Sequence, residues 1–211
     1  MTDRVAVGKR SHQRGNQFEA EIAKKFSAWS GKEFNRTPAS GSLHWGDNNQ
    51  FKVDGDVITS DTNWPFLIEC KRYDSVKLGL EELMSGNEPF PKFIAQSVRE
   101  GLHTKCPWML VFRRNRIHGF VLFPYTDKLA LTFSNYVVKT INYTSELTGL
   151  EESIKTFTIP LDDLLDTPYS AVCNIYESPL GWKSWIKEIE KPAVKEPDIN
   201  SLMKGIDDLD L

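Results

Sequence analysis

Two carboxylates and a lysine stand on neighbouring apolar segments of the chain. Asp56 ends one apolar strand, and Glu69 and Lys71 lie on the next one, in the segment of residues 66–71. Because side chains alternate faces along a strand, Glu69 and Lys71 point the same way, roughly 6–7 Å apart. Turn-forming residues at 60–65 separate the two segments. This pattern predicts a hairpin that folds Asp56 back beside Glu69.

Such an arrangement suits a hydrated divalent cation. Mg²⁺ takes oxygen ligands and keeps several waters, so one or two carboxylates and a substrate phosphate are enough to hold it. A bound cation polarises a phosphoryl oxygen and lowers the pKa of a bound water, while a nearby ammonium positions the nucleophile or neutralises developing charge. The residues therefore indicate a metal-dependent nuclease site, with Asp56 and Glu69 as ligands and Lys71 as the ammonium.

The competing interpretation is a solvated strand face, because Asp, Glu and Lys are abundant on protein surfaces. The residues before Glu69 weigh against it, since Phe66, Leu67 and Ile68 are typical of a strand that is buried on both faces. Charged side chains are seldom placed against such a core unless they are paired or bound to a metal. The setting favours the catalytic interpretation.

The elements around these residues alternate between helical and extended patterns. Apolar residues at helical spacing predict an amphipathic helix over residues 15–30 that ends near Gly31. The expected order is then a strand at 33–37, a loop at 38–42, the hairpin, a polar and partly helical insertion, a helix at 91–104 and strands at 108–112 and 119–123. This order predicts an α/β fold with a mixed central β-sheet flanked by helices.

Length and composition predict one globular domain with a small appendage. The chain has 211 residues, of which 40% are hydrophobic, enough to bury a substantial core. No apolar run reaches the length of a membrane span and the first residues lack a secretory signal, so a soluble, cytoplasmic protein is expected. Three distant cysteines, Cys70, Cys106 and Cys173, predict neither a zinc site nor a disulfide framework.

Charge is distributed unevenly, although the formal net charge is only −3. Residues 1–46 contain eight Lys or Arg and four Asp or Glu, a local charge of +4. Residues 187–211 contain four Lys and seven Asp or Glu, a local charge of −3. A local basic excess can contact phosphates even in an acidic protein, so the amino-terminal portion is compatible with a nucleic-acid partner.

Four short motifs give the chain a resemblance to a known superfamily. They are Gly15-x-x-x-Glu19 on the first helix, Arg36-x-x-x-Ser40-Gly41, Gly55-Asp56 and Glu69-Cys70-Lys71. In this order and spacing they resemble the PD-(D/E)XK nuclease superfamily, and within it the archaeal-type Holliday junction resolvases and related phage endonucleases. The resemblance covers roughly residues 9–125 and implies a restriction-endonuclease-like core.

The resemblance implies roles for the matching residues. The metal ligands would be Glu19, Asp56 and Glu69, holding Mg²⁺ or Mn²⁺ as a substitute, with Lys71 as the catalytic lysine and Ser40 near the scissile phosphate. Basic positions expected to contact the DNA backbone are Arg10, Arg14 and Arg36, and the basic turn after residue 112 adds Arg113, Arg114 and Arg116 as candidates.

Several positions depart from the superfamily pattern or leave an alternative open. Gly55 stands where the family name implies proline, and Asp54 is an alternative ligand on the same strand face. Glu21 is expected to face solvent, and it is also the alternative to Glu19 as a ligand. Gln96, on the helix after the catalytic strand, is either a surface residue or a group that orients a metal-bound water.

The chain divides into three predicted parts. Residues 1–125 would form the nuclease core, residues 126–190 an extension packed on it, and residues 191–211 an acidic, flexible tail. The tail is either a solubilising segment or one that docks on a protein partner.

The expected activity is Mg²⁺-dependent hydrolysis of DNA phosphodiesters, foremost in four-way junctions during recombination and repair, by a host or phage protein. A two-fold symmetric junction cut at paired sites calls for two active sites, hence a homodimer. Two alternatives are cleavage of ordinary duplex DNA and a catalytically inactive DNA-binding accessory protein.

Overall fold

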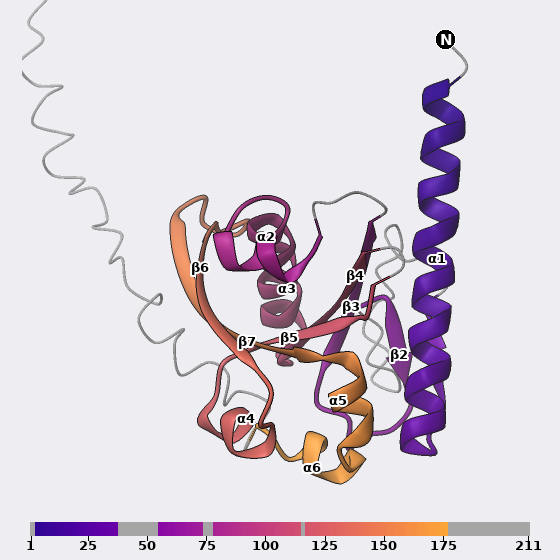
Figure 1. The fold of residues 1–211 in the computed structure, drawn as a ribbon, viewed down its shortest axis with the longest axis vertical. Coiled ribbons are helices and arrows are strands. Elements are labelled where there is room, and N and C mark those ends of the chain that lie inside the picture. The colour runs from indigo at the N-terminus through magenta and orange to yellow at the C-terminus, as the bar shows by residue number, and fades with distance from the viewer. Residues whose placement is uncertain (1–2, 38–54, 74–77, 115–116, 177–211) are drawn as a thin grey trace, which may run out of the picture.

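A seven-stranded β-sheet with helices on both sides forms the body of the protein (Figure 1). The computed structural model describes residues 3–37, 55–73, 78–114 and 117–176, with side chains from residue 13 onward. Strand order is β1-β2-β3-β4-β5-β7-β6, in which β3 and β4 are parallel and the other neighbours antiparallel. This confirms the predicted α/β class with a mixed sheet flanked by helices.

The helices and strands follow one another in a simple order. The helices are α1 (Asp3–Ser30), α2 (Leu80–Ser85), α3 (Phe90–Thr104), α4 (Asp127–Thr132), α5 (Leu161–Asp166) and α6 (Tyr169–Cys173). The strands are β1 (Phe34–Arg36), β2 (Val57–Thr59), β3 (Leu67–Tyr73), β4 (Trp108–Arg114), β5 (Phe120–Pro124), β6 (Val137–Thr144) and β7 (Glu151–Pro160). Helix α1 lies against β1, β2 and β3, whereas α3 lies against β3, β4 and β6.

Helix α1 is longer than the sequence predicts. Its second half buries Phe18, Ile22 and Phe26 against the sheet, and it ends where Gly31 takes a positive φ of 67° and donates its N–H to the Ser27 carbonyl at 3.0 Å. Its first half extends past the sheet without a partner element among the described residues (Figure 1). The predicted start at residue 15 was therefore too late, because a projecting half needs no apolar periodicity.

The predicted hairpin between Asp56 and Glu69 is confirmed. Val57 on β2 pairs with Ile68 on β3, and the Asp56 amide donates to the Ile68 carbonyl at 2.8 Å. Gly55 enters this hairpin with φ 105°, and a Cβ there would lie only 2.8 Å from the same carbonyl oxygen. Glycine is required at this position because a side chain would push the two strands apart, which explains why proline does not stand there.

The central strands follow the expected order of helix and strand. From β3 the chain crosses through α2 and α3 to the parallel neighbour β4, and β5 then folds back antiparallel. Strand β7 pairs with β5 and β6 with β7, so the sheet continues past the boundary predicted at residue 125. The division into core and extension stays a prediction, and the tail lies outside the described residues.

Two further findings concern composition. In the described part of the chain, none of the three cysteines forms a disulfide. No helix within the described ranges is long and apolar enough to span a lipid bilayer.

Candidate active site

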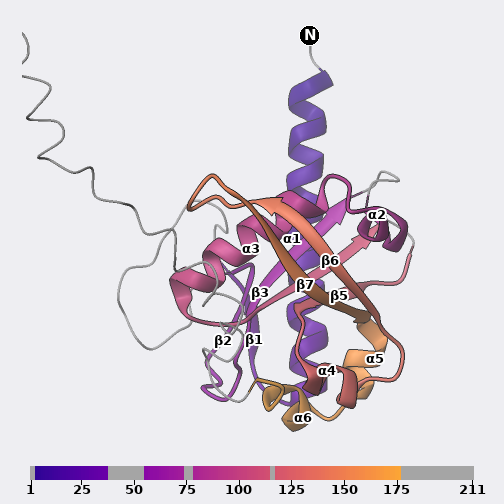
Figure 2. The same ribbon diagram turned by 90° about the vertical axis from the view of Figure 1, so that its left-hand side faces the viewer.

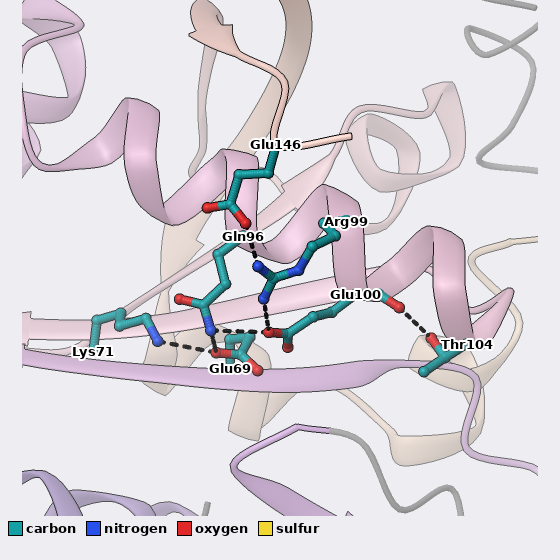
Figure 3. Close-up of polar contacts among 7 residues, drawn as sticks. All are labelled: Glu69, Lys71, Gln96, Arg99, Glu100, Thr104 and Glu146. Atoms are coloured by element: carbon teal, nitrogen blue, oxygen red, sulfur yellow. Dashed lines mark hydrogen bonds and ion pairs between the residues drawn. The ribbon is translucent and has the colours of Figure 1, made fainter. Parts of the chain in front are cut away.

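Glu69 and Lys71 lie on one face of β3, under helix α3. The Lys71 ammonium donates to Glu69 Oε2 at 3.0 Å (Figure 3). The Glu69 side chain is only 2% exposed and that of Lys71 17%. Lys71 also lies 5.8 Å from the centre of the Phe93 ring of α3. The pair is thus held between strand and helix rather than on a solvated face.

Asp56 is fixed at the start of β2 by the neighbouring strand. Its Oδ2 accepts the Cys70 amide hydrogen at 2.8 Å. Burial, helped by the charges of Glu19 and Glu100 and opposed by the Lys71 charge and the Cys70 amide, raises the pKa of Asp56 to about 6. The carboxylate therefore belongs to an acidic group drawn from several elements.

The same charges shift the pKa values of Glu69 and Lys71. Burial and then the Asp56 charge raise the pKa of Glu69 well above its usual value. Burial alone would lower the pKa of Lys71, but the charges of Glu69 and Asp56 raise it on balance. Buried carboxylates that raise one another's pKa around one ammonium form a site where an added cation is favourable.

Glu19 reaches this region from helix α1 but is bound to an arginine. Arg36 Nε on β1 donates to Glu19 Oε2 at 2.8 Å, and Glu19 is nearly buried. Among the residues that the structure describes, no three Asp, Glu, His or Cys side chains are grouped as a cation cage. The carboxylate donors suit a hard cation, and Arg36 engages one of the two Glu19 oxygens.

Glu100 is a site neighbour that the sequence analysis missed. Gln96 on α3 is half-buried, and its Nε2 donates to Glu69 Oε2 and to Glu100 Oε1, both at 3.1 Å. Arg99 binds Glu100 Oε1 at 2.7 Å and also binds Glu146 in the turn after β6 (Figure 3). These bonds form a chain from Glu69 to the β6–β7 turn. The i, i+4 spacing of Gln96 and Glu100 on a helix was the signal that could have revealed it.

The residues predicted to contact DNA differ in their exposure and in their partners. Arg14 is exposed on α1, and Arg114 is half-buried at the end of β4. Arg113 donates two hydrogen bonds of 2.7 Å to Glu21, whose side chain is 35% exposed and so partly faces solvent, as expected. The side chain of Arg10 and the whole of Ser40, Asp54 and Arg116 lie outside the described residues.

Comparisons with known proteins place these residues in a wider group. Residues 10–172 match the model of a family described as phage putative PDDEXK endonuclease. This range begins within α1 and ends in α6, so it includes β6 and β7 as well as the acidic site. No curated protein and no solved structure matches the chain.

Proposed function

The chain belongs to the phage PD-(D/E)XK endonuclease family, and from this premise we propose that it hydrolyses DNA phosphodiester bonds with the help of a divalent cation. Nucleases of this superfamily generally use divalent metals. The observation that carries the proposal is the Lys71 ammonium bound to buried Glu69 next to Asp56, whose pKa is raised to about 6. Strongly shifted pKa values of this kind cluster at functional sites.

The metal would be held by Glu19, Asp56 and Glu69, and Mg²⁺ or Mn²⁺ fits their oxygen donors. When bound, such an ion supplies polarisation of a phosphoryl oxygen and a lower pKa for a bound water. Lys71 presents a positively charged N–H donor that orients the attacking water or neutralises charge on the phosphate. The Cys70 amide fixes the Asp56 carboxylate, and the Gln96 amide fixes that of Glu69.

The proposed substrate is branched DNA, foremost a four-way junction, cut by a homodimer. The resemblance to junction resolvases supports this choice, and two symmetric cuts require two active sites. Ser40 and Arg36 would position the scissile phosphate, and Arg14 would contact the DNA backbone. An inactive accessory protein is a weaker proposal, because it would gain nothing from keeping two buried carboxylates and a lysine together.

The test compares cleavage of a labelled four-way junction with cleavage of the matching linear duplex, in Mg²⁺, in Mn²⁺ and with chelator. Lys71→Ala removes the ammonium, and Lys92→Ala is its matched control because Lys92 is 77% exposed and pairs only at the surface, with Glu88. We expect metal-dependent paired nicks in the junction that disappear in Lys71→Ala and persist in Lys92→Ala.

Each other result changes the assignment. Equal cutting of both substrates would make the protein a duplex endonuclease of the same fold. Binding of DNA without cleavage in either metal would refute the catalytic proposal. Cleavage by Lys71→Ala at the wild-type rate would refute the role given to Lys71.

A further inference from the structure

Two arginines lie side by side on the face of the sheet that α1 covers. Arg72 on β3 and Arg113 on β4 are register partners in the parallel pair, so their side chains point to the same face. Arg113 binds Glu21 and lies 4.7 Å from the centre of the Phe18 ring, both on α1. Because Arg72 directly follows Lys71, it faces α1 and not the acidic site.

Helix α1 adds further charges to this face. Arg14, Phe18 and Glu21 are spaced i, i+4 and i+7 and therefore share one side of the helix, while Lys25 lies 3.8 Å from Glu21. We call Arg14, Glu21, Lys25, Arg72 and Arg113 the arginine cluster. With four basic residues and one acidic residue, its formal charge is +4 − 1 = +3.

The electrostatics of the arginine cluster favour an anion. Burial lowers the pKa of Arg72, and the Arg113 charge lowers it further, while Glu21 opposes this effect. Like charges on neighbouring strands repel, and an added negative group would relieve the repulsion. The Arg113 side chain is 20% exposed and that of Glu21 35%, so solvent reaches the cluster. Guanidinium groups match phosphate because their planar donors form paired hydrogen bonds.

The projecting half of α1 leads away from the arginine cluster. Figures 1 and 2 both show this half extending beyond the sheet as a continuous helix. Residues 3–13, which precede Arg14 of the cluster, contain three basic residues and one aspartate, a formal charge of +3 − 1 = +2. The basic charge of the cluster thus continues along the helix in one direction.

We propose that the arginine cluster binds a backbone phosphate of duplex DNA outside the cleaved step, and that the projecting half of α1 extends this contact along the same duplex. The proposal rests on the proposed DNA nuclease function. Duplex DNA carries a dense row of negative charge, which complements this surface. A second copy that met this surface with its own arginine cluster would be repelled.

The test measures affinity for a labelled linear duplex by fluorescence anisotropy, using the full chain with chelator over a series of salt concentrations. Arg72→Gln and Arg113→Gln should each raise Kd by about five- to tenfold and make the salt dependence shallower by about one unit of log–log slope. Lys24→Gln is the matched control, since Lys24 is exposed on α1 outside the cluster. It should bind as tightly as the parent.

Glu21→Gln should change Kd in the opposite direction, because it removes the one carboxylate of the arginine cluster. We expect tighter DNA binding by about two- to fivefold at low salt, with an unchanged far-UV circular dichroism spectrum. A purely structural cluster predicts weaker binding in this variant, because Arg113 would lose its anchor.

Three outcomes would overturn the proposal. They are Kd values for Arg72→Gln and Arg113→Gln that match Lys24→Gln, weaker binding by a folded Glu21→Gln, and a change of oligomeric state in the arginine variants on sedimentation. Since binding is measured with chelator, it does not depend on turnover. If the chain does not cleave DNA but the cluster variants change Kd as expected, only the catalytic proposal is refuted. If the chain cleaves DNA but the cluster variants leave Kd unchanged, only the proposal for the arginine cluster is refuted.

Discussion

The two faces of strand β3 carry opposite chemistry within four residues. On the face toward α3, buried Glu69 lies with half-buried Lys71 and Gln96 in a group dominated by carboxylates. On the face toward α1, Arg72 stands beside Arg113 in a group dominated by guanidiniums. The period of two along a strand is enough to separate them. Under the two proposals, one strand would hold a cation on one side and a phosphate on the other.

This difference suggests that turnover and affinity for DNA can be changed separately. In these proposals the acidic face would be neutralised by a metal, whereas the basic face would be neutralised by the DNA backbone. A variant on one face should therefore leave the property of the other face intact. The predictions below test that separation, beginning with the largest effect.

Glu69→Gln should lower cleavage by about 10³-fold, because it removes a charged metal ligand at nearly constant volume. The Kd for duplex DNA in chelator should stay within about threefold of the parent, since the basic face is untouched. The two measurements are single-turnover cleavage and anisotropy. A parallel loss of affinity would show that the two faces act together.

Glu100→Gln and Arg99→Gln should each lower the affinity for the metal by about 10- to 100-fold, the range typical of groups that orient ligands. The reason is the bond chain through Gln96 to Glu69. The measurement is the Mn²⁺ concentration that gives half-maximal cleavage. Glu146→Gln should have a smaller effect because it lies one bond further away. If all three variants change only the melting temperature, these groups are structural.

Gly55→Ala should cost about 1–3 kcal/mol of folding free energy, because its φ of 105° and its contact with the Ile68 carbonyl are both unfavourable for a side chain. Strand displacement there should also raise the metal requirement through Asp56. Gly149→Ala is the control, since φ is 71° but no atom lies within 4 Å of the added Cβ. Urea unfolding of the two variants measures the difference, and equal losses would rule out the contact as the cause.

Glu21→Gln should change stability by less than about 1 kcal/mol, because the Arg113 pair is partly exposed and screened. This is the smallest expected effect, and it sets the basic face apart from the acidic one. Thermal unfolding at low and high salt measures it. A loss several times larger would mean that Glu21 holds α1 on the sheet.

Much of strand β3 and its hairpin could be predicted from the sequence because the signals are local. The residue types at 60–65 indicate a turn, and the period of two along a strand places Glu69 and Lys71 on one face. The order of strands and helix along the chain from β3 to β4 was also predicted. Local patterns therefore indicated the elements that carry the candidate site.

What escaped prediction depends on contacts between distant residues. Arg113 and Glu21 are 92 positions apart, and only the docking of α1 on β4 brings them together. Glu100 looked like any helical glutamate until Gln96 was seen to bridge it to Glu69. The pairing of β7 with β5 likewise has no local signal, because strand neighbours are chosen by the whole sheet.

The length of α1 sets a scale for the DNA that the protein could cover. At about 1.5 Å per residue, residues 3–14 span about 18 Å of helix axis. Duplex DNA rises by about 3.4 Å per base pair, so this span equals about five base pairs on one side of the body. Shortening a duplex on that side should therefore reduce affinity stepwise until those five base pairs are gone. Further shortening on that side should have little effect, so the length of the helix would determine the shortest duplex that binds at full affinity.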